Sequence, residues 1–161
     1  MAQIIPTIVH EVFEGDEDPI AIRAYSRFDH WLSEEEAESS FMTGEAIRTL
    51  YDYEIVASFE LRFVRFIVAL REVCPLHLIH TARGTVARAP IDFSKLFFGY
   101  RKYIERSQTM SFYAPKYQLV IMLSHDFTIL VFGAQCNVLV ELDLAAEQVG
   151  LHTLPVQFKQ A

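Results

Sequence analysis

Three adjacent residues, Ser124, His125 and Asp126, carry the side chains from which hydrolytic sites are often built. A serine nucleophile, a histidine base and an aspartate that orients the base form a catalytic triad, and His and Asp are also common metal ligands. Side chains that are adjacent in one chain do not converge as a triad requires, and a metal site needs at least three converging ligands. These residues also stand between two apolar runs of strand length, where Asp commonly forms turns. We therefore predict a turn at residues 124–126 that binds no metal.

A second pair of imidazoles, His77 and His80, is three residues apart. On a helix this spacing places both rings on one face, as a shared metal ion requires, whereas on a strand the rings point to opposite faces. The segment follows Pro75 and is rich in strand-forming residues, so we predict a strand and no metal site. The alternative is a hydrolase whose site assembles from scattered residues, with His77, His80, His125 and Asp126 as its candidates.

The two cysteines, Cys74 and Cys136, lack the CxxC spacing of redox and zinc sites. The first residues of the chain do not have the charge or the apolar stretch of a secretion signal, so we expect reduced, structural thiols in a cytoplasmic protein. The sequence leaves open whether the two thiols are close in the fold. It contains no glycine-rich phosphate-binding motif and no apolar run of the about 20 residues that span a bilayer, so we predict no cofactor and no membrane partner.

Charge is unevenly distributed along the 161 residues, whose net charge is −7. Residues 1–60 carry 14 acidic and 3 basic side chains, whereas residues 61–116 carry 3 acidic and 10 basic ones. The negative balance disfavours nucleic acid as the main ligand, because phosphates are bound by clustered Lys and Arg. The acids can be a solvated surface, or they can attract a partner protein with a basic surface. The candidate residues for such a binding surface are Glu14, Asp16, Glu17, Asp18, Glu34, Glu35 and Glu38.

The segment from Phe97 to Tyr117 interleaves aromatic with basic side chains. Such a segment can stack on single-stranded bases, but Tyr, Met and Arg are also enriched at protein interfaces. Its first part continues the apolar periodicity of a helix over Asp92–Ser107, capped by its first residue. The part that follows has no such explanation, and we predict a partner-binding groove or loop that presents Phe112, Tyr113 and Tyr117.

Two further helices are indicated nearer the N-terminus. Ser33 and Glu36 have the spacing of a capping box, in which each side chain bonds the backbone amide of the other residue. Glu54–Val73 has a narrow polar stripe opposite a broad apolar face, which predicts a long, largely buried helix. A shorter helix capped by Thr43 can lead into it.

The remaining segments indicate a sheet. A hairpin is predicted from Leu76–Ala82 and Thr85–Ala89, and an antiparallel meander from Gln118–Leu123, Phe127–Phe132 and Asn137–Leu142. The opening segment Gln3–Phe13 fits an edge strand or a short helix, and Ile20–Trp31 is undecided.

These elements predict a single α+β domain over residues 1–161, with helices mainly in the N-terminal half packed on an antiparallel sheet formed mainly by the C-terminal half. Without a catalytic motif, we expect a non-enzymatic protein-binding module, such as an inhibitor, an immunity (antitoxin-like) protein or an adaptor, that binds a basic protein. The hydrolase is one alternative, and a structural subunit that self-associates, for example as a homodimer, is another.

Overall fold

The computed structural model describes residues 6–16, 19–33, 35–36, 49–80, 85–92, 110–123, 128–134 and 137–156. The helices within these ranges are α1 (Thr7–Glu14), α3 (Leu50–Val73) and α5 (Val138–Gln148). The strands are β1 (Arg23–Ser26), β2 (His77–His80), β3 (Thr85–Val86), β4 (Met110–Ala114), β5 (Leu119–Leu123), β6 (Thr128–Phe132) and β7 (His152–Leu154). The predicted α+β class is confirmed, with most of the strands in the second half of the chain.

The strands form one antiparallel sheet in the order β3-β2-β4-β5-β6-β1-β7. The predicted hairpin of β2 with β3 and the predicted pairing of β5 with β6 are confirmed. Strand β1, which the sequence left undecided, is inserted between β6 and β7. It therefore ties the acidic N-terminal third of the chain to the C-terminal half.

Helix α3 begins at a capping box that the sequence analysis missed. The hydroxyl of Thr49 accepts a hydrogen bond from the Asp52 amide at 3.1 Å, and the Asp52 carboxylate accepts one from the Thr49 amide at 2.8 Å. The helix predicted over Glu54–Val73 is confirmed, but this cap places its first residue at Leu50. The predicted cap at Thr43 lies outside the described residues. No helix in the described part of the chain is both long and apolar enough to cross a membrane.

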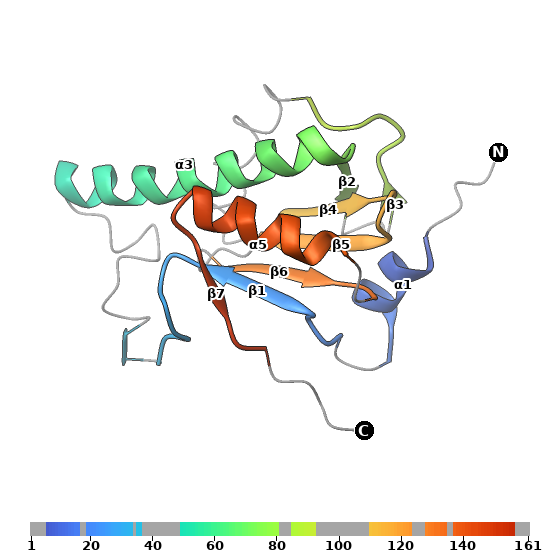
Figure 1. Ribbon diagram of the computed structural model, residues 1–161, viewed down its shortest axis with the longest axis horizontal. Coiled ribbons are helices and arrows are strands. Elements are labelled where there is room, and N and C mark those ends of the chain that lie inside the picture. The colour runs from blue at the N-terminus through green and yellow to red at the C-terminus, as the bar shows by residue number, and fades with distance from the viewer. Residues whose placement is uncertain are drawn as a thin grey trace.

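The larger part of the core lies where α3 and α5 cover one face of the sheet (Figure 1). Phe66 of α3 has no exposed surface, and its ring centroid is 5.3 Å from that of Tyr25 in β1. The Tyr25 hydroxyl donates to Asp143 of α5 at 2.8 Å, and the Arg23 Nε is 3.3 Å from the same carboxylate oxygen. One strand is thus joined to both helices. Burial, with the bond to Asp143 second, raises the pKa of Tyr25, so this hydroxyl remains a donor.

A smaller cluster covers the opposite face of the sheet. Val9 and Val12 of α1 pack there with Val120 of β5 and Phe132 of β6, and all four are buried. Because successive strand residues point to opposite faces, β4 and β5 contribute to both clusters. These strands are consequently almost continuously apolar, without the alternation of a half-exposed strand.

The strand predicted over Asn137–Leu142 is wrong, because this segment begins α5. Its first residues are β-branched or leucine, which suggested a strand. The buried positions that follow, Leu142, Ala145 and Ala146, continue at the steps of three and four that a helix requires. Similarly, the described part of Gln3–Phe13 forms a helix, which starts directly after Pro6.

The exposed groove or loop predicted for Phe112 and Tyr113 is also wrong. Both residues belong to β4, all of whose residues are buried. Phe112 is 0% exposed and Tyr113 is 7% exposed, so neither ring is available to a partner. The two rings serve the two opposite faces of the sheet, and Tyr117, in the turn after β4, is half-buried against the larger cluster. The core therefore accounts for the aromatic side chains of Phe112 and Tyr113, whereas residues 97–109 of this segment lie outside the described residues.

The capping box at Ser33 and Glu36 is confirmed. The Glu36 amide donates to the Ser33 hydroxyl at 3.3 Å, and the Glu36 carboxylate accepts from the Ser33 amide at 2.9 Å. The helix predicted to follow Asp92 and the turn predicted at residues 124–126 lie outside the described residues.

Removal of the Phe66 ring tests the packing of α3. Phe66→Ala is expected to lower the free energy of unfolding by about 3–5 kcal/mol, because it leaves a cavity between α3 and β1. Leu61→Ala in the same helix is the control, since Leu61 is 42% exposed, and its cost should stay below about 1 kcal/mol. Urea denaturation gives both values. Equal costs would show that α3 does not bury this face.

Candidate functional site

A wide, open groove of about 610 Å³ lies between α1, the segment that follows it and the end of β6. We call it the α1 groove. Its lining residues are Ile8, Glu11, Val12, Gly15, Asp16, Pro19, Ile20, Phe132, Gly133 and Ala134. Most of these are apolar, and the two charged ones are acidic. The groove can therefore hold an apolar group and place a positive charge against a carboxylate.

The walls of the α1 groove differ in exposure. Val12 and Phe132 are buried and form part of the small cluster beneath α1. Ile20 is 42% exposed, and Glu11 and Asp16 are exposed as well. A large aliphatic side chain that remains accessible beside two carboxylates is a feature of binding surfaces, although single exposed apolar residues also occur without a function.

Two glycines set the shape of the groove. Gly15 ends α1, and a Cβ there would lie 2.6 Å from the carbonyl oxygen of Glu11. Gly133 ends β6 with φ of +135°, and a Cβ there would lie 2.7 Å from the carbonyl oxygen of Gln118. Both approaches are closer than a side chain tolerates, so each glycine permits a backbone turn at the groove that another residue would displace.

The predicted acidic residues lie in different parts of the structure. Asp16 lines the α1 groove, and Glu14 is exposed at the end of α1, with one carboxylate oxygen 3.5 Å from the His10 imidazole. Glu17 and Asp18 lie outside the described residues. Sequence reasoning missed Glu11. Once residues 7–14 are known to be a helix, the steps of three and four place Glu11 beside Ile8 and Glu14 beside Glu11, so the helix assignment was the missing signal.

Glu35 is exposed and lies in the segment that follows β1. Asp16 precedes β1 and Glu35 follows it, and Figure 1 shows the α1 end and the segment after β1 on opposite sides of the strand. Glu34 and Glu38 lie outside the described residues. The described acids of the predicted surface therefore lie in two groups, one before and one after β1, and Asp16 of the first group lines the α1 groove.

The histidines that were weighed as metal ligands do not converge. His77 and His80 lie on β2, as predicted, so their rings point to opposite faces of the strand. The His77 Nδ1 is 2.9 Å from the carbonyl oxygen of Ala87, which occupies that nitrogen with a backbone contact. His125 and Asp126 lie outside the described residues. Within the described ranges, no three His, Cys, Asp or Glu residues are placed to hold one metal ion.

Cys74 is a buried free thiol at the end of α3. Its Sγ donates to the carbonyl oxygen of Pro75 at 3.3 Å. Burial raises the pKa of this thiol, which disfavours the thiolate that a nucleophile or a metal ligand would need. Cys74 therefore behaves as a small core residue. Cys136 lies outside the described residues.

A cluster of two arginines joins the end of β1 to α3. The Arg27 guanidinium carbon is 3.8 Å from the ring centroid of Phe59, and that of Arg62 is 5.3 Å from the same centroid. Burial, with the charge of Arg62 second, lowers the pKa of Arg27 to about 10, so it stays protonated at neutral pH. Arg62 also donates to the carbonyl oxygen of Gly150 at 3.0 Å. These contacts fix the segment after β1 against the helix.

Comparisons of the chain with protein-family models, with curated proteins and with solved structures find no match. The assignment of the candidate site therefore rests on the geometry and the charge of the groove.

Substitution of Gly133 tests the backbone that closes the groove. Gly133→Ala should lower the free energy of unfolding by about 1–3 kcal/mol, because its φ is unfavourable for alanine and the added Cβ meets the carbonyl of Gln118. Gly150→Ala is the matched control: its φ is +75°, but the nearest heavy atom to an added Cβ is 3.6 Å away. Thermal denaturation should rank Gly133→Ala as the more destabilised variant, and the reverse order would contradict this geometry.

Proposed function

We propose that the chain is a non-enzymatic protein-binding module whose α1 groove receives a basic segment of a partner protein. The composition of the groove carries this proposal. Apolar walls from Val12, Ile20 and Phe132 adjoin the carboxylates of Glu11 and Asp16. Lys and Arg complement both properties, because each has an apolar stem and a positive end.

The charge around the groove supports the same class of partner. Of its lining residues, all of which belong to the described part of the chain, none is basic. Glu14 adds a third carboxylate at the end of α1, and His10, its ion-pair neighbour, is positive only when protonated. Neighbouring acids repel one another, and a cation from outside relieves this repulsion. The net charge of −7 extends the attraction over a longer range and accelerates encounter with a basic partner.

Inhibitors, immunity proteins and adaptors all act by holding another protein, and an acidic module of this size fits each of these roles. The proposed partner is a protein with an extended basic segment that also carries apolar side chains. Such a segment can lie in an open groove without a large change of shape in either protein.

One observation favours self-association as a second candidate function. Val140 and Leu144 of α5 are 65% and 53% exposed, and they are one helical turn apart. A second copy that covers this face would make a homodimer. Sedimentation velocity of the wild-type chain and of a Val140→Glu, Leu144→Glu variant decides between a dimer through α5 and a monomer.

A peptide selection tests the proposed function. A random-peptide library displayed on phage is selected on the immobilised full chain, and the affinities of the enriched peptides are measured by fluorescence polarisation. We expect these peptides to be rich in Lys or Arg next to apolar residues. Glu11→Lys combined with Asp16→Lys should weaken their binding about tenfold, or about 1.4 kcal/mol. Each exposed ion pair contributes about 0.2–1 kcal/mol, and reversal adds repulsion of similar size.

The matched control is Glu54→Lys combined with Glu72→Lys, which makes the same change of net charge at two exposed positions of α3. If the control weakens binding as much as the groove variant, attraction is due to net charge alone and the groove is not the site. Enriched peptides without basic residues would refute the proposed class of partner.

A further inference from the structure

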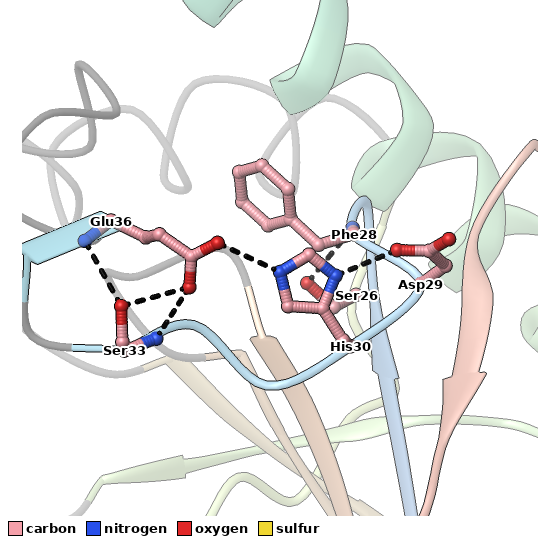
Figure 2. A network of polar contacts seen from close by, with 6 residues as sticks. All are labelled: Ser26, Phe28, Asp29, His30, Ser33 and Glu36. Carbon is pink, nitrogen blue, oxygen red and sulfur yellow. Dashed lines mark hydrogen bonds and ion pairs between the residues drawn. The ribbon is translucent and has the colours of Figure 1, made fainter.

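His30 lies between two carboxylates in the exposed segment after β1 (Figure 2). Its Nδ1 is 2.7 Å from Oδ1 of Asp29, and its Nε2 is 3.2 Å from Oε1 of Glu36. The second Glu36 oxygen accepts hydrogen bonds from the amide and the hydroxyl of Ser33, both at 2.9 Å. The imidazole thereby links the turn that follows β1 to the helical turn that contains Glu36.

These two contacts cannot both be hydrogen bonds from a neutral ring. A neutral imidazole has a single N–H, whereas the protonated ring donates from both nitrogens. Ionised Asp29 and Glu36 are acceptors only, so satisfying both requires a positively charged His30. We propose that Asp29, His30 and Glu36 form a pH-sensitive clasp, which is closed while His30 is charged and opens when it loses its proton.

The groups around His30 favour its charged form. The hydrogen bond to Asp29 and then that to Glu36 raise the pKa of His30 above its ordinary value of 6.5. The bond from His30 lowers the pKa of Asp29, and the bonds from Ser33 lower that of Glu36. His152 of β7 also acts on Asp29, in the same direction as His30 but more weakly.

One further charged side chain, that of Arg27, lies near the Phe28 ring, which also neighbours His30. The Phe28 ring centroid is 6.5 Å from that of His30, and the Arg27 guanidinium lies 4.2 Å from the centroid of the same Phe28 ring. Arg27 also lies over Phe59, which holds it against α3. The aromatic ring is thus a neighbour of both cations.

The direction of each pKa shift sets the pH range in which the clasp is closed. Folding raises the pKa of His30. The contribution of its contacts to the stability of the folded chain is therefore complete below pH 6.5 and is lost as the pH rises through the raised pKa. Folding lowers the pKa of Asp29 and of Glu36. Their contributions to the stability of the folded chain are therefore complete above the ordinary pKa values of 3.8 and 4.5, and are lost as the pH falls through the lowered pKa values. The clasp is therefore closed in mildly acidic solution and opens on the alkaline side.

The chain contains a natural reporter for this change. Its single tryptophan, Trp31, directly follows His30. The indole Nε1 donates to the carbonyl oxygen of Pro155 at 2.7 Å, and Trp31 is 47% exposed. Opening of the clasp frees the segment that carries this indole, so its fluorescence emission should change with the protonation of His30.

The test is a fluorescence titration of the full chain between about pH 5 and pH 8, the range in which histidine charge changes. We expect a single transition with a midpoint above 6.5 in the wild-type chain, its loss in His30→Gln, and its retention in His152→Gln. Proton NMR of the His30 ring should give the same midpoint. Asp29→Asn should move that midpoint down, because it removes the carboxylate that raises the pKa of His30 most.

A transition that persists in His30→Gln would overturn the clasp, as would a wild-type His30 midpoint at or below 6.5. Far-UV circular dichroism checks that His30→Gln is folded. If it is not, the NMR midpoints of the wild-type chain and of Asp29→Asn still decide the matter, because a midpoint unaffected by Asp29→Asn excludes the proposed contact.

Discussion

Strands β4 and β5 carry apolar side chains on both of their faces, so both faces of the sheet need a cover. On one face, α3 and α5 bury Phe66, Phe112 and Ile121 in the larger cluster. On the other face, α1 contributes Val9 and Val12 to the smaller one. Each large apolar side chain buried in this way contributes about 1.5–3 kcal/mol. The position of α1, which shapes the candidate site, therefore follows from the need to cover the second face.

The same constraint explains why the α1 groove is acidic on one side and apolar on the other. An eight-residue helix that turns Val9 and Val12 toward the sheet must direct Glu11 and Glu14 elsewhere. Phe132 and Gly133, at the end of β6, form the facing wall. The groove thus combines side chains that belong to the core with side chains that belong to the surface. This combination suits a basic segment with apolar side chains, which is the basis of the proposed function.

The sequence predicts the local features of this fold better than its non-local pairings and its candidate site. The apolar face of α3, the β2–β3 hairpin and the Ser33 capping box are local patterns, and all three are confirmed. Helix α5 was missed because its first turn contains the β-branched Val138 and Val140, whereas the helical spacing of its buried residues is clear only from Leu142 onward. The rings of Phe112 and Tyr113 were assigned to a surface because a strand buried on both faces has no polar alternation. The separation of Asp16 from Glu35 depends on β1, whose pairing with β6 and β7 is non-local.

The most direct test of the account is to locate where a basic probe contacts the chain. Backbone amide NMR signals of the full chain are followed as a short lysine oligomer is added at low salt. The account predicts that the largest shifts occur at Glu11 and Asp16 and at Gly133 and Ala134 across the groove, and that added salt reduces them. Largest shifts around Glu35, or shifts spread evenly over all acidic residues, would contradict the claim that the α1 groove is the binding surface.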